Sequence, residues 1–436
     1  MDELILIGVF LTILLFFLGS GIWVGISLIG VSVVGMFLFT SRPVGDAMAT
    51  TIWSASSSWT LTALPLFIWM GEILFRTKLS ENLFRGLAPW LNRLPGGLLH
   101  VNIAGCAIFA AISGSSAATV ATVGKMSIPE LQRRQYPERM IIGTLAGAGT
   151  LGLLIPPSII LIIYGVTINE SIAKLFMAGV FPGIMLALLF MSYVVIWSLL
   201  NRSRMPDPDP PASWGLKIRA FMELAPAALL IIAVLGSIYL GIATATEAAV
   251  LGVIGAFLIA AFQGSLTVES FRESLLGATR TSAMIALILA GSSFLSLAMG
   301  FTGLPRGLAS WIGELGLSPL TLIVALTIFY IVLGCFLDGI SAVVLTMAVI
   351  EPLVRQAGFD MIWFGIYLVV VVEMAQITPP IGFNLFVLQG MTGRDMDFIA
   401  RAALPMFGIM ILAVVVLYAV PEVATYLPHV MSQPTR

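Results

Sequence analysis

The sequence predicts an all-α integral membrane protein built as an inverted-topology repeat, with two re-entrant hairpins and two broken helices. Three observations lead to this fold class. Apolar runs of membrane-spanning length recur along the 436 residues, a double-proline motif interrupts one apolar run in each half, and motifs of the first half return in the same order in the second. The chain is 59% hydrophobic and 10% charged with a mean hydropathy of +1.05, values that exclude an ordinary soluble protein.

Residues 1–200 form the first predicted repeat, which opens with three spans. These are the apolar runs Leu4–Leu18, Ile22–Phe39 and about Leu61–Leu74. The first run follows two acidic residues and no small-residue cleavage site follows it, so we expect a retained span rather than a signal peptide. The next stretch, Leu83–Leu91, is amphipathic and too polar to span, which predicts a helix at the membrane interface.

The first hairpin is predicted at about residues 98–128. Two short apolar limbs flank Ser113-Gly114-Ser115-Ser116. At 1.5 Å per residue neither limb crosses a hydrocarbon core of about 30 Å, so the pair is expected to enter and leave on the same side.

The first broken helix is predicted at residues 140–166, and a last span at about residues 172–200 follows it. Pro156 and Pro157 remove two backbone donors from an otherwise continuous apolar run. In a bilayer the freed carbonyls must find partners inside the protein or in a polar cavity. A packed proline kink is the alternative interpretation.

Residues 201–219 are predicted to be a cytoplasmic linker, and residues 220–436 the second repeat. Prolines crowd the linker, and after it the earlier motifs return. Leu304–Trp311 copies Leu83–Trp90, Thr378-Pro379-Pro380 copies Ile155-Pro156-Pro157, and Pro405 copies Pro182, at spacings that agree within two residues. The second hairpin is therefore placed at about residues 320–350, around Asp338-Gly339, and the second broken helix at residues 361–390.

The distribution of basic residues supports an inverted second half. Each half holds five full crossings, an odd number, so the second half enters the membrane upside down. With the N-terminus outside, the inner loops hold all but five of the 21 Lys and Arg residues. The exceptions are Arg42, Lys174, Arg306, Arg355 and Arg436. Both termini are thus predicted on the outer face.

The two hairpin tips and two proline breaks are expected to meet near the middle of the membrane and to bind solute and ion. Helix N-termini favour a carboxylate, and unwound carbonyls can ligate Na⁺. The alternative role for the small residues is tight helix packing. Asp338 can ligate Na⁺, cap a helix, or do both. Glu373 can belong to the site or to a buried polar pair, Asn384 can contact substrate or a neighbouring helix, and Glu247 can be a simple helix cap.

Other functional classes fit the sequence less well. A membrane serine hydrolase needs a buried general base, but the only histidines, His100 and His429, fall at predicted interfaces. An intramembrane aspartyl protease needs two facing aspartates, and only Asp338 is central. There is no Walker loop, and the net charge of −1 does not indicate a nucleic-acid partner. The sequence does not exclude a passive channel. Ion-coupled transport, without enzyme activity, fits it best.

Four motifs resemble a known family, and the resemblance covers essentially the whole chain. They are Ser113-Gly114-Ser115-Ser116-Ala117, Ile155-Pro156-Pro157-Ser158, Thr246-Glu247-Ala248-Ala249 and Thr378-Pro379-Pro380-Ile381-Gly382. Together they resemble the large membrane (M or DctM-type) subunit of tripartite ATP-independent periplasmic (TRAP) transporters. The resemblance implies an elevator-type, Na⁺-driven transporter in the bacterial inner membrane, with periplasmic termini. The expected partners are a periplasmic substrate-binding protein and a small Q membrane subunit, the latter as a separate chain because this one starts directly at its first span.

The resemblance also implies binding residues and at least two Na⁺ ions, with no organic cofactor. One Na⁺ site would use Ser113, Gly114, Ser115, Gly149, Thr150 and Pro156, and another Asp338, Gly339, Ser341, Gln376, Thr378 and Pro379. Substrate contacts are expected from Ser116, Pro157, Ser158, Pro380 and Asn384. The substrate would be an organic acid, with dicarboxylates, sialic acids, sugar acids and keto acids all open. The alternative function is a self-sufficient ion-coupled carboxylate symporter without a binding protein.

Overall fold

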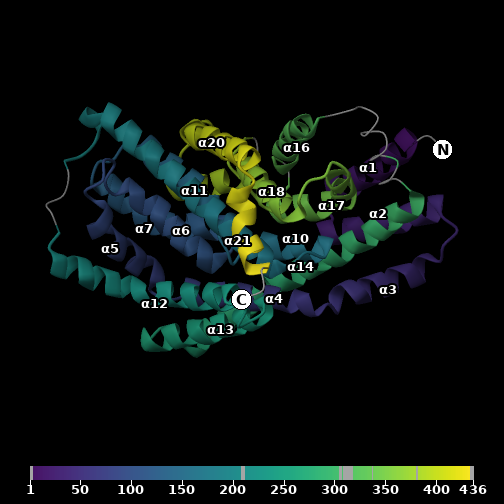
Figure 1. Cartoon of the computed structure of the whole chain (residues 1–436), viewed down its shortest axis with the longest axis horizontal. Helices are drawn as coiled ribbons and strands as arrows, with labels where there is room; N and C mark the ends of the chain where they lie inside the picture. The colour runs from purple at the N-terminus through teal and green to yellow at the C-terminus, as the bar shows by residue number, and fades with distance from the viewer. Residues whose placement is uncertain are drawn as a thin grey trace.

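A computed structural model describes residues 3–207, 212–303, 307, 318–335, 337–379 and 382–432, and within them the regular structure is helical, without a strand (Figure 1). Six of the described helices are long and apolar enough to cross a membrane, or up to eight if each of two bent helix pairs counts as one span. The predicted all-α class is confirmed for this part of the chain. Most of the copy at Leu304–Trp311, together with Pro380, lies outside the described residues.

The chain begins with helices that include one the sequence pattern did not indicate. They are α1 (Glu3–Gly19), α2 (Val24–Phe39), α3 (Val44–Ser56), α4 (Ala63–Phe75) and α5 (Leu79–Leu91), with a short 3₁₀ turn at Trp59–Thr62. The unexpected helix is α3, which contains Asp46 and several hydroxyl residues and therefore shows no long apolar run. It joins α4 at a bend of 53°.

Two interrupted segments follow, where prolines and glycines were expected to break the helices. They are α6 (Leu99–Ser113) with α7 (Ser116–Arg133), and α8 (Glu138–Gly149) with α9 (Leu151–Leu154) and α10 (Ile159–Ile168). The long α11 (Ile172–Leu200) comes next. Gly114 ends α6 with a φ of +57°, a left-handed conformation that glycine adopts without strain.

The second half also combines long helices with interrupted ones. It contains α12 (Trp214–Tyr239), α13 (Ala245–Phe262), α14 (Val268–Thr302), α16 (Pro319–Gly334), α17 (Gly339–Gln356), α18 (Met361–Gln376), α19 (Phe383–Thr392), α20 (Met396–Ala419) and α21 (Glu422–Ser432). Residues 214–219, placed in the linker by the sequence pattern, belong to α12. That helix starts early because the hydroxyl of Ser213 caps it by accepting from the N–H of Leu216.

Helices from the two halves interleave around the centre of the molecule. The hairpin helix α7 packs against α19, and α17 packs against α10, so each hairpin contacts the broken segment of the other half. Around them α14 packs against α2 and α4, and α4 also packs against α13. Most of the buried apolar residues described form one large cluster that joins both halves, and Met36, Phe294 and Ala298 form a small second one.

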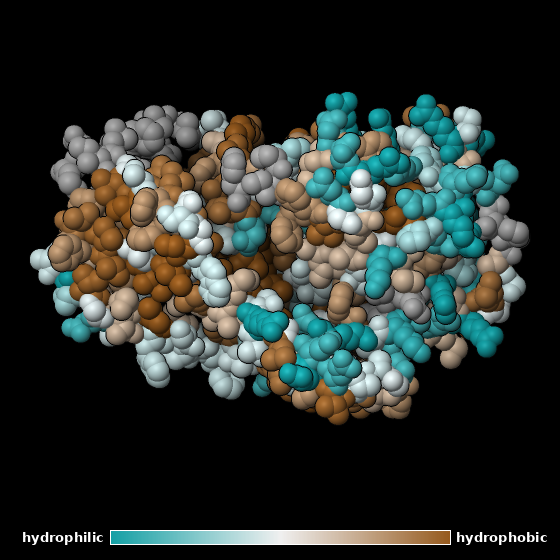
Figure 2. Space-filling model, turned by 180° about the vertical axis from the view of Figure 1, so that it is seen from behind, coloured by the Kyte–Doolittle hydropathy of each residue, from teal (hydrophilic) through white to brown (hydrophobic). Residues whose placement is uncertain are grey.

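The surface is strongly divided in character. Hydrophilic side chains gather toward the end of the molecule where α11 finishes and α12 begins, and much of the other end is hydrophobic (Figure 2). Large apolar side chains are exposed along α11 to α14, among them Leu188, Ile232, Leu258 and Phe262. Large apolar side chains exposed on several long helices are typical of helices that face lipid.

Candidate functional site

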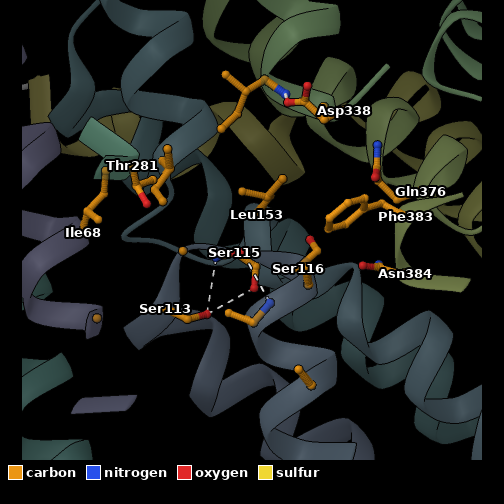
Figure 3. A pocket seen from close by; sticks show the side chains of 18 of the residues that line it. Ile68, Ser113, Ser115, Ser116, Leu153, Thr281, Asp338, Gln376, Phe383 and Asn384 are labelled. Atoms are coloured by element: carbon orange, nitrogen blue, oxygen red, sulfur yellow. Dashed lines mark hydrogen bonds between the residues drawn. The ribbon is translucent and has the colours of Figure 1, made fainter. Parts of the chain in front are cut away.

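A cavity of about 630 Å³ lies where the interrupted helices of both halves converge (Figure 3). Its walls come from α4, the junction of α6 and α7, α9, α14, and the facing ends of α17, α18 and α19. Of the predicted site residues, it brings together Ser113, Gly114, Ser115, Ser116, Asp338, Gly339, Gln376 and Asn384.

The first tip, Ser113–Ser116, is held by its own hydroxyl groups. Ser115 caps α7 by accepting from the N–H of Ala118 at 3.4 Å. The Oγ atoms of Ser113 and Thr119 are 2.9 Å apart, and Thr119 Oγ1 donates to the carbonyl of Ser115 at 2.7 Å. These bonds fix a tip with several oxygen atoms at the cavity wall.

The first proline break lies behind this tip rather than in the cavity wall. A Cβ added to Gly114 would lie 3.0 Å from the carbonyl oxygen of Pro157, and one added to Gly152 would lie 2.6 Å from Cα of Ser116. Ser158 caps α10 and donates to the carbonyl of Leu153. Of the predicted residues, Gly149, Thr150, Pro156, Pro157 and Ser158 do not line the cavity, whereas Leu153 and Ile159, which were not predicted, do.

The second tip, Asp338–Ser341, uses its aspartate as a helix cap. Asp338 Oδ2 accepts from the N–H groups of Ile340 and Ser341, both at 3.1 Å. Of the alternatives for Asp338, capping is therefore observed, and ion ligation stays a prediction. A Cβ on Gly339 would lie 2.8 Å from Val372, so a small residue lets this tip approach α18. Glu247 is likewise a cap, in a capping box with Thr244.

The remaining predicted residues of the second half lie beside this tip. Ser341 is buried, and its hydroxyl has no partner within the described part of the chain. Thr378 Oγ1 donates to the carbonyl of Met374 at 2.7 Å, and the carbonyl of Pro379 accepts from Cys335 Sγ at 3.3 Å. The predicted residues Ser341, Thr378 and Pro379 do not line the cavity.

Three polar side chains at the α18–α19 break are buried with unused hydrogen-bonding atoms. Ser116 Oγ donates to Glu373 Oε1 at 2.6 Å, so Glu373 both lines the cavity and belongs to a buried polar pair. Glu373 Oε2, Gln376 Nε2 and both amide atoms of Asn384 have no partner among the described residues. Unpaired buried polar atoms are costly, and their gathering at one wall indicates a place for a ligand or ion.

The opposite wall comes from α4 and α14, and neither helix was predicted at the site from the sequence. It contains Ile68, Gly71, Arg76, Thr281 and Met284. Arg76 pairs with Glu72 at 2.5 Å and with Glu273 at 3.4 Å, which joins α4 to α14. An apolar run does not reveal which of its faces meets a distant hairpin, so no sequence signal indicated this wall.

Neither His100 nor His429 lines the cavity. His100 was expected at an interface, but the surrounding helices bury it completely, and its Nε2 lies 2.8 Å from the carbonyl oxygen of Pro95. No group of three or more His, Cys, Asp and Glu side chains suited to a metal ion occurs in the part of the chain that was described.

Interrupted helices that meet at a cavity, within an apolar helical molecule, are typical of membrane transport proteins. The family is established by comparison. A model described as "Tripartite ATP-independent periplasmic transporter, DctM component" matches residues 11–423, and the chain belongs to this family. The resemblance seen in the four motifs is confirmed.

Similar proteins include large permease subunits of known systems. The C4-dicarboxylate TRAP transporter large permease protein of Pseudomonas aeruginosa is 32% identical over 88% of this chain and 89% of its own length. Its counterpart in Rhodobacter capsulatus is 31% identical over 99% and 100%. The sialic acid TRAP transporter large permease protein of Vibrio cholerae is 28% identical over 94% and 95%. These relatives are permeases, not enzymes.

A solved structure shares the fold. The YdaH transporter of Alcanivorax borkumensis superposes with a TM-score of 0.63, covering 91% of this chain and 96% of its own, at 13% identity.

Proposed function

We propose that the chain is the large permease subunit of a Na⁺-coupled secondary transporter that imports an organic acid. The acid is delivered by a periplasmic binding protein, and a small Q membrane subunit completes the transporter in the bacterial inner membrane. Family membership supports this assignment, as do relatives named for C4-dicarboxylates and sialic acid.

The observation that carries the proposal is the meeting of three helix N-termini at one cavity. The first residues of α7, α17 and α19 all contribute to its lining. Side chains cap α7 and α17, but no side chain within the described residues caps α19 at Gly382. The first N–H groups of a helix have no acceptor inside it, so the start of α19 suits a substrate carboxylate, with the Asn384 amide beside it.

The two tips suit Na⁺. Each offers hydroxyl, carbonyl or carboxylate oxygens, and each lies against a break in a neighbouring helix, where carbonyl groups leave the helical pattern. We assign one ion to the first tip with Gly149, Thr150 and Pro156, and another to the second tip with Gln376, Thr378 and Pro379.

Movement of the substrate follows from an inverted repeat. In such a repeat α7 corresponds to α17 and α19 to α10, and the packing of α7 on α19 then matches that of α17 on α10. The hairpins and broken helices would move as one body past a scaffold that includes α2, α4, α13 and α14, with both chain termini in the periplasm. The cavity between α4, α14 and the tips is the place where the moving body and the scaffold would meet.

Reconstitution tests this function. Proteoliposomes holding this chain and the Q subunit should take up the acid retained by the partner binding protein only when that protein and an inward Na⁺ gradient are both present. Uptake by this chain alone would instead establish the self-sufficient symporter. Uptake indifferent to the Na⁺ gradient would establish a passive channel and end the proposal.

A further inference from the structure

Glu373 is the buried acidic group whose role the proposed function leaves open. It lies in the last turn of α18, three residues before Gln376, lines the cavity and is fully buried. One carboxylate oxygen accepts from Ser116, and the other has no partner. No ion pair to Glu373 occurs among the described residues, where the ion pairs involve Glu72, Glu130, Glu138, Glu170, Glu273, Glu351 and Asp397.

A single hydrogen bond from a neutral hydroxyl does not offset the free energy needed to bury a carboxylate. Burial of an isolated charge without hydrogen bonds is among the costliest events in a protein interior, and inside a membrane such a group faces an ion, a partner or a cavity. The cavity here is bordered by Glu373 itself, so the missing donor can come from a bound solute.

The groups next to Glu373 can donate hydrogen bonds, and they therefore favour an acceptor such as a carboxylate. Gln376 offers an unpartnered amide N–H₂ group, and Asn384 an unpartnered amide at the uncapped start of α19. Figure 3 shows the side chains of Ser116, Gln376 and Asn384 around the same side of the cavity. Glu373 and Gln376 are three residues apart on one helix, a spacing that places their Cβ atoms about 5–6 Å apart.

We propose that Glu373 recognises a hydrogen-bond donor on the substrate, a hydroxyl or an ammonium group, while the α19 N-terminus with Gln376 and Asn384 holds the carboxylate. This inference rests on the proposed function and narrows its substrate to hydroxy acids and amino acids. Because the Cβ atoms of Glu373 and Gln376 are about 5–6 Å apart, we expect two to four carbon atoms between the donor and the carboxylate of the substrate. Acids without such a donor leave Glu373 unpaired and are rejected.

Matched pairs of acids test the inference by direct binding to the purified full chain in detergent with Na⁺. The pairs are L-malate with succinate, 3-hydroxybutyrate with butyrate, and 4-aminobutyrate with butyrate. In at least one pair the member bearing the donor should bind about 10- to 100-fold more tightly, the range of one hydrogen bond to a charged group. In the Glu373→Leu variant this preference should disappear.

Three further variants separate the possible results. Glu373→Gln keeps the size of the side chain and a hydrogen-bond acceptor but removes the charge. In this variant a preference for the hydroxyl-bearing acid should persist, whereas a preference for the ammonium-bearing acid should be lost. Asn384→Leu should weaken both members of a pair equally. Glu351→Gln, whose carboxylate pairs with Arg355 away from the cavity, should change neither affinity nor preference.

Any of the following results overturns the inference. Equal binding of both members in every pair, or a preference that survives Glu373→Leu, removes this role from Glu373 but leaves Na⁺-coupled uptake of an organic acid intact. If Glu373→Leu changes only the Na⁺ dependence of binding, Glu373 is an ion ligand instead. Failure of every acid to bind, with no Na⁺-driven uptake in proteoliposomes, rejects the inference and the proposed function together.

Discussion

Ser116 Oγ donates a 2.6 Å hydrogen bond to Glu373 Oε1 across 257 residues of sequence. The bond joins the first tip to α18, the first limb of the second interrupted segment. Both groups are buried, and both line the cavity. The two halves of the chain are therefore connected at the wall where we place the substrate.

Loss of the Ser116 hydroxyl should destabilise the protein. Ser116→Ala leaves Glu373 buried without its donor, which costs about 1–3 kcal/mol and should lower the Tm measured in detergent. Adding Glu373→Leu to Ser116→Ala should recover part of that loss, because replacing both partners removes the unpaired group. Ser192→Ala is the control, since its exposed hydroxyl bonds only within α11. Equal Tm values for Ser116→Ala and the control would show that the bond contributes nothing.

The charge of Asp338 and its capping role can be separated. Asn caps helices about as well as Asp, so Asp338→Asn should keep the Tm while weakening the Na⁺ dependence of transport. Asp338→Ala should also lose about 1 kcal/mol of stability. Asp360 is a matched control, because it caps α18 through two N–H groups in the same way and does not line the cavity. If Asp338→Asn and Asp360→Asn transport with the same Na⁺ dependence, Asp338 is only a cap.

The contact between α9 and the first tip should be sensitive to a single methyl group. A Cβ at Gly152 would lie 2.6 Å from Cα of Ser116 and 2.7 Å from the carbonyl oxygen of Ser115, so Gly152→Ala must displace the tip. We expect a lower Tm and a weaker apparent affinity for Na⁺ in transport assays. Gly408→Ala meets open space in α20 and should be neutral or stabilising by up to about 1 kcal/mol. Matching behaviour of the two variants would contradict this packing.

The sequence predicted the order of elements well because the relevant signals are local. Apolar length predicted α11 and α20, and helix breakers predicted the interruptions at Gly114 and Pro156. The sequence missed α3, because a helix with Asp46 and many hydroxyl groups has no apolar run of spanning length. The predicted linker ended at residue 219, six residues too late. The prolines before Ser213 indicated a linker, and Ser213 was not recognised as the cap of α12.

The site was less accessible to sequence reasoning because it depends on contacts between distant segments. Ser113, Asp338 and Asn384 line the cavity as expected, but Thr378 and Pro379 lie beside it. A helix break shows where carbonyls are freed, and not which side of the break faces the solute. A buried polar pair was one of two alternatives for Glu373, but the sequence did not indicate Ser116 as its partner, since no local pattern links the two residues.

The most direct test of Na⁺-coupled import follows ²²Na⁺ and the labelled acid together in proteoliposomes that contain this chain, the Q subunit and the binding protein. The account predicts that each acid molecule enters with a fixed number of Na⁺ ions, at least two. It also predicts that Asp338→Asn lowers both fluxes, whereas Asp360→Asn lowers neither. Entry of the acid without accompanying ²²Na⁺ would contradict the account.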